Sequence, residues 1–433
     1  MLWLKNNIVE TSYNLALEKS NYERKEKCRK LLDFYHDEQL IYVYERLQKH
    51  FSDPDKFSLA SLNIVKKIID GLSAVYIEDA KRIISKDQTK FDQIQTKAKL
   101  GIKMKAANRL SKLLGTMLIK VVYRNGKIEL DLITGDVADV VVGDSPEDLK
   151  SVTICYYPES GKRDEVSYTE WTDTTINFYD HDKNLKSYAD NPYQILPFIP
   201  IWDSLPIADF WVEKGDSLIS VQEAINEKLT DLMYILRLQG FSVPVTSGSN
   251  SEIGILDPGQ ALNLPEGASF TFEAPNSPIS SHLSTIEFLI RNTAISYGLP
   301  ASYLSSKPSE RKSGLSRLIE NKELAEKRAD DIALFRSYES QTFEIIRLIN
   351  NYHNPNNKIS MDAEFKVDFA EPKNMNISEQ AQSWAMLIDK NAMSAIDIIQ
   401  KLNPDLSREE AEQVYLFNLE INNASNKDGK LEE

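Results

Sequence analysis

The chain has 433 residues, more than the roughly 250–300 at which a single hydrophobic core stops growing, so its length predicts more than one packing unit. Hydrophobic residues make up 42% of the sequence and charged residues 27%, a balance typical of globular proteins and not of disordered chains. The formal net charge of -14, from 51 basic and 65 acidic side chains, disfavours a protein that grips DNA through counterion release, although a local basic patch remains compatible with it.

The cysteines and the N-terminal residues both indicate an intracellular location. Cys28 and Cys155 are far apart and lie in no CxxC or other metal-binding spacing, which favours buried thiols in a reducing environment. The first residues, MLWLKNNIVETSYNLALEKSNYERK, reach charged side chains too soon for a signal peptide, and no window holds about 18 consecutive apolar residues. We therefore expect a soluble intracellular protein with no membrane association.

Residues 1 to about 117 are predicted to be mostly helical. In SLNIVKKIIDGLSAVY the apolar residues recur at intervals of three and four and so share one helix face, with Ser61 as a candidate N-cap. These apolar residues are Leu62, Val65, Ile68, Ile69, Leu72 and Val75. A charged helix is expected from about residue 90, and Gly115 is placed to end it.

The spacing then changes to alternation, which predicts strands. MLIKVVYRNGKIELDLIT holds two alternating runs around Asn125 and Gly126, whose tolerance of positive φ suits a tight hairpin turn. Further short strands are predicted from VADVVVG, SVTICYYP, EVSYTEW and TTINFYD, so an antiparallel sheet is inserted among the helices. From Asn191 the prolines of NPYQILPFIPIWDSLPIADFW exclude a helix and predict an extended crossing segment.

Two predicted helices bracket a small insert. The first runs from about residue 213 to 239 and ends at Gly240, and the second runs from about 282 to 297 and ends at Gly298. Residues 241–281 combine prolines and turn formers with brief apolar pieces such as FSVPV and GILD, which predicts short strands and turns.

The longest predicted helix covers residues 316 to about 352, which contain neither glycine nor proline. Its charged flanks indicate a spine and not a buried core helix. EFKVDF then predicts one alternating strand, and two or three helices follow from Ser378 to about Asn422. Ser407 and Glu410 form a predicted capping box for the last of these helices.

One short spacing suggests a catalytic serine. In SSKPSERKSGLS, Ser309 precedes Lys312 by three residues, as a serine nucleophile precedes its base in one class of acyl-transferases. Those enzymes also need separate SDN and KTG elements, and neither occurs in this sequence. A solvated polar loop explains the spacing, and a serine hydrolase is retained only as an alternative.

Other patterns predict no active site. The sequence contains no phosphate-binding G-x-x-x-x-G-K-[ST] loop and no G-x-G-x-x-G dinucleotide motif. The triplet from Asp180 to Asp182 is interpreted as a turn with solvated acids, and the adjacent Asp330 and Asp331 as a solvated helix face. We therefore expect a protein that is not an enzyme, with no catalytic residue, no metal and no cofactor.

The segment between Leu299 and Arg317 is basic in an acidic chain. Four basic residues against Glu310 give it a net charge of +3. The four are Lys307, Arg311, Lys312 and Arg317. Such a loop at the head of a long helix can contact a phosphate backbone without sequence preference, or can pair with neighbouring subunits or water. The sequence leaves both interpretations open.

The order of these elements resembles that of portal proteins, the head-to-tail connectors of tailed double-stranded-DNA bacteriophages. The matching pieces span most of the chain: NIVKKIIDGLSAVY, LLGTMLIKVVYRNGKIELDLIT followed by ADVVV, NPYQILPFIPIWD, YGLPASYLSS leading to SGLSRLIENKELAEKRADD, and FKVDFAEPKNMNISEQAQSWAMLIDKNAMSAIDIIQKL. None of them is a catalytic motif, so the resemblance rests on element order and hydrophobic pattern.

The resemblance implies an α+β, mostly helical portal fold with wing, stem, clip and crown regions that assembles as a ring. The implied regions are a wing at 1–205, a first stem helix at 206–240, a clip at 241–281, a second stem helix at 282–298, a tunnel loop at 299–315, a long wing or spine helix at 316–354, a strand returning to the wing at 355–377, and crown helices with a tail at 378–433.

The same resemblance implies a structural role. Such proteins form a ring, usually a dodecamer, at one capsid vertex of the virion, through which double-stranded DNA is packaged and ejected without sequence specificity. The implied partners are the large terminase subunit, major capsid and scaffold proteins, and later the head-completion and tail adaptors, with assembly in the host cytoplasm. A monomeric intracellular adaptor or scaffold protein is the competing interpretation.

Two residue sets follow from the regional assignment. The candidate DNA-facing residues of the tunnel loop are Ser305, Ser306, Lys307, Arg311, Lys312 and Arg317. The candidate clip residues for partner docking are Phe241, Val243, Val245, Ile253, Ile255, Phe270 and Phe272. The clip strands suit pairing between subunits, because one such short hairpin is too small to be stable alone.

Overall fold

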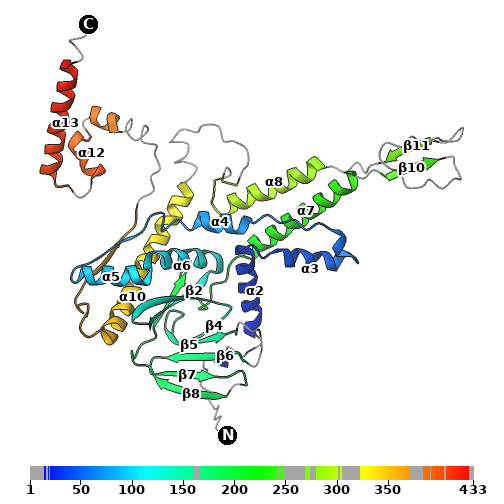
Figure 1. Ribbon diagram of the computed structural model, residues 1–433, viewed down its shortest axis with the longest axis horizontal. Helices are drawn as coiled ribbons and strands as arrows, with labels where there is room; N and C mark the ends of the chain where they lie inside the picture. Colours follow the sequence, from blue (N-terminus) through cyan, green and yellow to red (C-terminus); the bar gives the residue numbers. More distant parts are fainter. Residues whose placement is uncertain are drawn as a thin grey trace. The chain divides into compact units, whose positions relative to one another are not determined.

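The computed structural model shows a chain of helices and antiparallel sheets, so the predicted α+β class is confirmed (Figure 1). It describes residues 14–15, 18, 20–158, 161, 165–182, 184–240, 243–247, 269–273, 279–300, 303–304, 322–370, 384–390, 392–403 and 406–428. Two compact units divide the chain: Met1–Pro308 with Glu323–Ala370, and Ser309–Lys322 with Glu371–Glu433. Within the described residues, no helix has the length and apolar character needed to cross a bilayer.

A three-stranded sheet forms the centre of the first unit. Its strands, in the order β3-β2-β9, are β2 (Thr116–Arg124), β3 (Lys127–Thr134) and β9 (Phe198–Trp202). The predicted hairpin is confirmed, since Asn125 and Gly126 join β2 to β3 with φ values of 52° and 76°. The proline-rich stretch is more than an extended crossing, because it supplies β9. Pro200 is tolerated there because β9 is an edge strand of this sheet.

A five-stranded antiparallel meander, β4-β5-β6-β7-β8, packs beside the central sheet (Figure 1). Its strands are β4 (Ala138–Val142), β5 (Leu149–Tyr156), β6 (Ser167–Thr172), β7 (Thr175–Tyr179) and β8 (Leu185–Asp190). The first four confirm the alternating patterns of the sequence. The fifth escaped prediction because all six of its residues are exposed, so it carries no apolar alternation.

Helices in the N-terminal part differ from the sequence prediction in two places. They are α2 (Ser20–Tyr35), α3 (Leu40–His50), the short 3-10 helix η1 (Pro54–Lys56), α4 (Ile64–Leu72), α5 (Gln88–Ala98) and α6 (Leu100–Leu114). Asn63, not Ser61, caps α4 by accepting a hydrogen bond from the backbone N–H of Lys66 at 3.0 Å. The expected single helix before Gly115 is two helices, because Lys99 adopts φ 53° between them.

A two-stranded sheet also interrupts this mostly helical region. Strand β1 (Lys81–Ile84) pairs with β12 (Phe365–Asp368), which joins two segments more than 280 residues apart. Strand β12 was predicted from the alternation of EFKVDF, whereas β1 was not, because its sequence KRII carries no apolar alternation.

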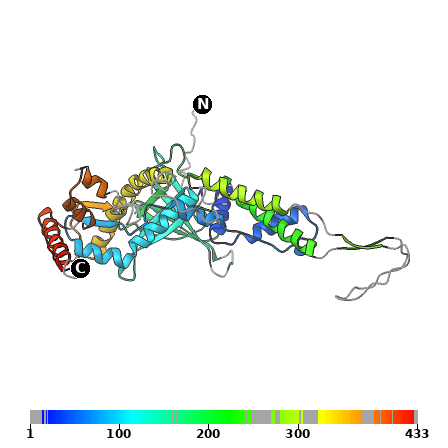
Figure 2. The ribbon, with the colours of Figure 1, turned by 90° about the horizontal axis from the view of Figure 1, so that it is seen from above.

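Two antiparallel helices, α7 (Asp216–Gly240) and α8 (Ile279–Ser296), lie side by side in both ribbon views, and we call them the arm (Figures 1 and 2). Between them in the chain, β10 (Val243–Ser247) pairs with β11 (Ser269–Glu273). Helix α3 packs on α7 along the side of α7 away from α8. The sequence prediction of two helices bracketing short strands is therefore confirmed, while GILD and the predicted turns lie outside the described residues.

The long helix α10 (Lys322–His353) has 32 residues and packs in the core of the first unit, so the interpretation as an exposed spine was wrong. Buried aliphatic and aromatic residues line one face, and charged residues are buried with them. Arg82 donates to both carboxylate oxygens of Glu339, at 2.8 and 2.6 Å, and Tyr76 Oη donates to the same carboxylate at 2.7 Å. Internal partners therefore allow charged positions to face the core.

The second unit contains α12 (Ala395–Leu402) and α13 (Arg408–Asp428), which pack against each other. The predicted capping box is confirmed, because Ser407 and Glu410 exchange their two hydrogen bonds. Ala411 is the only buried apolar side chain in the described part of this unit. Among their described side chains, the two helices therefore show almost no buried apolar surface.

Candidate functional site

The sequence-predicted tunnel-loop residues, Ser305, Ser306, Lys307, Arg311, Lys312 and Arg317, all lie outside the described residues, as does the Ser309 and Lys312 pair. Of the clip set, Phe241, Ile253 and Ile255 also lie outside them. The remaining four are placed by their backbone in the β10–β11 ribbon. Its register sets Val243 opposite Glu273, Val245 opposite Thr271, Phe270 opposite Thr246, and Phe272 opposite Pro244. The structure therefore describes the elements on either side of the basic segment, and these form the candidate site.

The end of α8 and the start of α10 are held together. Gly298 ends α8 with φ 75°, and the N–H of Leu299 donates to the carbonyl of Ala294 at 2.9 Å. Lys327 of α10 donates to the carbonyl oxygen of Tyr297 at 3.0 Å. The dipole of α8 also stabilises a cation at this C-terminal end of the helix. A Cβ at residue 298 would overlap the side chains of Lys327 and Glu323, so glycine permits this close approach.

Residues just after α8 are anchored on α4. Leu299 is buried in the hydrophobic cluster that also holds Ile68. Tyr303 Oη donates to the carbonyl of Lys67 at 3.3 Å, and its ring lies so close to Gly71 that a Cβ there would overlap it. The basic segment thus begins beside α4 and rejoins the described chain in α10, and both attachment points belong to packed helices.

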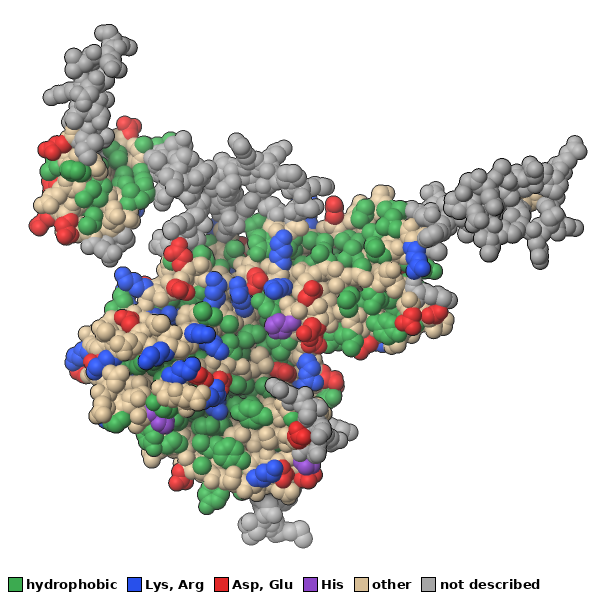
Figure 3. All heavy atoms as spheres, in the orientation of Figure 1, with side chains coloured by type: hydrophobic (Ala, Val, Ile, Leu, Met, Phe, Trp, Pro, Cys, Tyr) green, Lys and Arg blue, Asp and Glu red, His purple; other side chains and the backbone are tan. Residues whose placement is uncertain are grey.

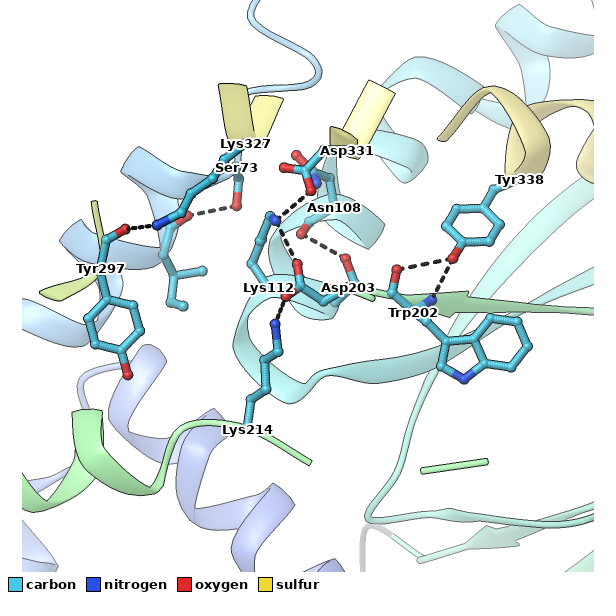
Figure 4. Close-up of polar contacts among 12 residues, drawn as sticks. Ser73, Asn108, Lys112, Trp202, Asp203, Lys214, Tyr297, Lys327, Asp331 and Tyr338 are labelled. Atoms are coloured by element: carbon cyan, nitrogen blue, oxygen red, sulfur yellow. Dashed lines mark hydrogen bonds and ion pairs between the residues drawn. The ribbon is translucent and has the colours of Figure 1, made fainter. Parts of the chain in front are cut away.

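A buried cluster of two lysines and two aspartates joins the arm to the body, and we call it the polar junction (Figure 4). It consists of Lys112 in α6, Asp203 after β9, Lys214 before α7, and Asp331 in α10. Lys112 Nζ lies 2.6 Å from Asp203 Oδ1 and donates to Asp331 Oδ1 at 2.7 Å, while Lys214 pairs with Asp203 Oδ2. Helix α6, the segment between β9 and α7, and α10 therefore meet at one point.

The electrostatics of the polar junction make it intolerant of change. Burial raises the pKa of the Asp331 carboxyl, and the charge of Lys112 opposes that shift. Burial and the nearby Lys112 lower the pKa of the Lys214 amine. Since burial disfavours the charged form of both groups, each depends on its partners for its charge. Beside them, both amide atoms of Asn108 are buried without a hydrogen-bond partner.

Helix α10 makes a second contact with the same region of the body. Tyr338 Oη donates to the carbonyl of Trp202 at 3.1 Å and accepts from its backbone N–H at 3.2 Å (Figure 4). Burial raises the pKa of Tyr338 to about 12. Because Asp203 follows Trp202 directly, the polar junction and this contact fix the same stretch of chain against α10.

The contacts of these groups hold elements of the first unit together. Each lysine of the polar junction contacts at least one of its two carboxylates. Burial raises the pKa of the Cys28 thiol to about 12, so the reactive thiolate is disfavoured. In the described ranges, no group of three or more His, Cys, Asp or Glu side chains could hold a metal. Asp180 accepts two backbone hydrogen bonds, from Asp182 and Asn184, as a turn residue does.

Sequence reasoning missed the polar junction. Asp331 was interpreted as part of a solvated helix face, which is wrong, because its exposed fraction is 6%. Lys112 and Lys214 lie in mixed polar stretches, and Asp203 follows a strand. No short motif connects the four, since the contacts of Lys112 join residues about 90 and 220 positions apart, so only the tertiary fold reveals the group.

The arm exposes apolar side chains (Figure 3). On α8, Phe288 is 64% exposed and Ile295 is 49% exposed, while Met233 and Leu236 of α7 are both more than 40% exposed. An exposed apolar surface of this kind is typical of protein–protein contacts. It lies on the same element that the polar junction fixes to the body.

No protein-family model and no curated protein sequence matches the chain. Among solved structures, it is similar to a chain from the virion of a native gene transfer agent (GTA) particle, with 12% identity, TM-score 0.48, and coverage of 84% of this chain and 92% of that one. It is also similar to a chain from the neck of an empty GTA particle with C6 symmetry (13% identity, TM-score 0.49, coverage 80% and 91%) and to one from the neck of a native GTA particle with C12 symmetry (13%, 0.44, 78% and 88%). Similarity at this level supports no statement about function.

Proposed function

We propose that the chain is the subunit of a portal ring, a channel at one capsid vertex through which double-stranded DNA enters and leaves. The observation that carries this proposal is the arm with its anchored loop ends. Two antiparallel helices with exposed apolar residues are fixed at their base, and a basic segment is attached between the end of α8 and α10. A ring subunit needs such a rigid projection to meet its neighbours.

Exposed apolar residues distinguish a ring subunit from a monomeric adaptor. A monomer would bury its larger apolar surfaces within one chain, whereas Phe288 and Ile295 are exposed along two turns of α8. The second unit supports the same conclusion, because its two helices bury only Ala411 among their described apolar residues. Both regions gain a hydrophobic environment if copies of the chain pack side by side.

Charge supports a channel in which DNA slides. A chain with net charge -14 repels phosphate over most of its surface, and the +3 segment between Leu299 and Arg317 concentrates positive charge in one loop. In this assignment α7 and α8 form the stem, β10 and β11 belong to the clip, and the basic segment is the tunnel loop. The wing at 1–205 with 355–377 and the crown at 378–433 complete the subunit.

The partners follow from this assignment. The clip, with Val243, Val245, Phe270 and Phe272 in its paired strands, would meet the large terminase subunit during packaging and head-completion adaptors afterwards. The wing would contact capsid and scaffold proteins. The ring, dodecameric in this proposal, would assemble in the host cytoplasm and remain in the virion. No step of this role requires an active site or a cofactor in the chain.

The mass and shape of the purified protein test the proposal directly. Native mass spectrometry combined with negative-stain microscopy should show rings of about a dozen subunits with a central channel. A protein that remains monomeric or dimeric at all concentrations used for assembly would refute the portal assignment. Ser309 would then be tested with an acylating probe, because the hydrolase alternative depends on its nucleophilicity.

A second experiment tests the tunnel loop within assembled rings. Replacing Lys307, Arg311 and Lys312 with alanine should leave ring mass unchanged and alter the amount of DNA packaged or retained per particle, because the loop loses its positive charge. The matched control replaces three exposed lysines of the body, Lys97, Lys150 and Lys366, which changes the net charge equally. Unchanged DNA content in the loop variant would refute the role of these residues.

A further inference from the structure

A cavity of about 300 Å³ lies between α3 and α7. Its inner wall is apolar, with Phe34, Val43 and Leu47 buried there, and Phe51 lines it with an exposed fraction of 43%. The volume is about ten times that occupied by one water molecule, which leaves room for the seven carbon atoms of a phenylalanine side chain. The cavity therefore has the size and the lining of a site for one aromatic residue.

Three carboxylates line the cavity on its α7 side, and each already pairs with a cation of the same chain, Asp231 with Lys228 at 2.9 Å. Glu223, Glu227 and Asp231 follow one another at four-residue intervals, so they lie on one face of the helix. Arg46 Nη1 contacts Glu223 Oε2 at 3.0 Å, and Arg46 Nη2 contacts Glu227 Oε2 at 3.3 Å. A carboxylate accepts several hydrogen bonds, so Glu227 can receive a further cationic donor.

Helix α8 carries a side-chain pattern that fits this cavity. Phe288 and Ile295 are seven residues apart and share one face, opposite the buried Ile286 and Ala294. Arg291 follows Phe288 by about one turn and is exposed. It makes no ion pair with another residue of the described ranges. An exposed aromatic residue next to an arginine is typical of the few residues that dominate binding energy at interfaces.

The two features cannot meet within one chain. Helix α7 lies between α8 and α3 (Figure 1), and the cavity is lined from the α3 and α7 side. Phe288 is exposed on the face of α8 opposite Ile286, which is buried in the hydrophobic cluster shared with α7. Complementary patches on different sides of one subunit produce a head-to-tail contact that repeats from copy to copy. Such a contact closes into a ring when the rotation between copies is suitable.

We propose that Phe288 of one subunit inserts into the α3–α7 cavity of the next subunit, with Arg291 placed against Glu227 and Asp231. The occupant of the cavity is thus a second copy of this chain. The inference rests on the ring proposed above and names the contact between its subunits. Complementary charge and complementary shape on the same chain support this occupant over an unrelated partner.

Cysteine cross-linking tests the contact. The variant Phe288→Cys/Phe51→Cys should give a ladder of covalent oligomers on oxidation or with a short bismaleimide, because each subunit would carry both halves of the contact. A mixture of the two single variants should give covalent dimers only, and neither single variant alone should cross-link. The native Cys28 and Cys155 are buried and should contribute little background. The matched control, Ile207→Cys/Phe51→Cys, uses a side chain that is 96% exposed and far from the proposed contact in sequence, and should give no ladder.

Charge reversal gives an independent readout in the same rings. Arg291→Glu and Glu227→Arg should each weaken subunit association at least about tenfold, and the double variant should recover most of the loss, because the pair is restored with its signs exchanged. Native mass spectrometry of diluted samples measures this as the fraction of intact rings. Circular dichroism checks that each variant remains folded.

The possible outcomes separate this inference from the proposed function. Intact rings with no ladder, and with unchanged dilution behaviour in Phe288→Ala and Arg291→Glu, would overturn the Phe288 contact while leaving the ring proposal in place. Covalent dimers from Phe288→Cys alone would also overturn it, because they would indicate a symmetric α8–α8 contact. A wild-type protein that forms no rings would overturn both proposals.

Discussion

Replacing Lys112 with methionine should destabilise the first unit by about 3–5 kcal/mol at neutral pH. Lys112 is the only residue of the polar junction that contacts both aspartates, and the side chains of Lys112, Asp203 and Asp331 are 12%, 7% and 9% exposed. Removing one member of a buried ion pair leaves an uncompensated charge, and losses of about this size are typical of such changes. Methionine keeps most of the volume of the lysine stem, so the loss reports charge and not packing.

The loss in this variant should depend on pH. Without Lys112 the pKa of Asp331, already raised by burial, rises further, because the charge that lowered it is gone. Between the unfolded value of 3.8 and the raised folded value, the folded state binds more protons than the unfolded state, so stability falls as pH rises. The destabilisation should therefore be largest above the folded pKa and should shrink as pH falls from 7 toward 4.

Urea unfolding at fixed protein concentration measures the stability difference, and hydrogen exchange of peptides from α6 and α10 localises it. The double variant Lys112→Met/Asp331→Leu removes one positive and one negative charge and leaves Asp203 paired with Lys214. It should be more stable than Lys112→Met alone by at least about 1 kcal/mol, because the uncompensated charge is gone. A loss below about 1 kcal/mol for the single variant, or the same loss at pH 5 and pH 8, would refute the reasoning.

Three further predictions concern single residues. Gly298→Ala should destabilise the first unit by about 1–3 kcal/mol in urea unfolding, because the residue has positive φ and a Cβ would overlap Lys327; a change within error would contradict this. Burial lowers the pKa of Lys120 to about 8, so the unfolded state binds more protons than the folded state between pH 8 and 10.5. Over that range the folding stability of the wild type should rise by up to about 3 kcal/mol relative to Lys120→Met. The contact of the charged amine with the Trp171 ring reduces this gain. A flat difference across that range would refute the assignment. Thiol titration at pH 8 should find Cys28 unreactive in the folded protein and reactive in denaturant, because burial raises its pKa to about 12, and rapid reaction in the folded state would contradict its burial.

Sequence patterns predicted the features whose causes are local. The Asn125–Gly126 hairpin depends on two neighbouring residues that accept positive φ, and the capping box depends on Ser407 and Glu410, three residues apart. Gly115 likewise ends α6 through its own backbone conformation. In each case the physical cause lies within a few residues, so the sequence was sufficient.

Features with distant causes were missed or assigned wrongly. Strand β1 exists because Lys81–Ile84 finds β12 more than 280 residues later, and nothing within four residues predicts that partner. Ser61 and Asn63 are both acceptable caps by residue type, and the first turn of α4 begins next to Asn63 because Gln222 of α7 accepts hydrogen bonds from Ile64 and Val65. Tertiary contacts decided each of these outcomes.

The candidate site also combines a feature that the sequence shows with one that only the tertiary fold shows. The basic character of the segment between Leu299 and Arg317 is evident from residue counts alone. Its attachment to the body is not, because the contacts of Tyr303 with Lys67 and of Arg328 with Ala74 join residues more than 230 positions apart. Composition therefore indicated which residues could meet DNA, and the fold was needed to show what holds their segment.

Burial in the first unit reverses the usual distribution of polarity in two places, and the two reversals are connected. Charged groups are buried where α6, β9 and α10 meet the base of α7, and apolar groups are exposed along α8 and the outer part of α7. A buried ion cluster restricts the directions in which its elements can sit, because each charge requires its partner at hydrogen-bond distance. An arm oriented in this way would present Phe288 and the α3–α7 cavity at a fixed angle to each other, and a head-to-tail contact closes into a ring only when that angle is constant. On this reasoning, weakening the polar junction should broaden the distribution of ring sizes even though none of its four residues lies in the proposed subunit contact.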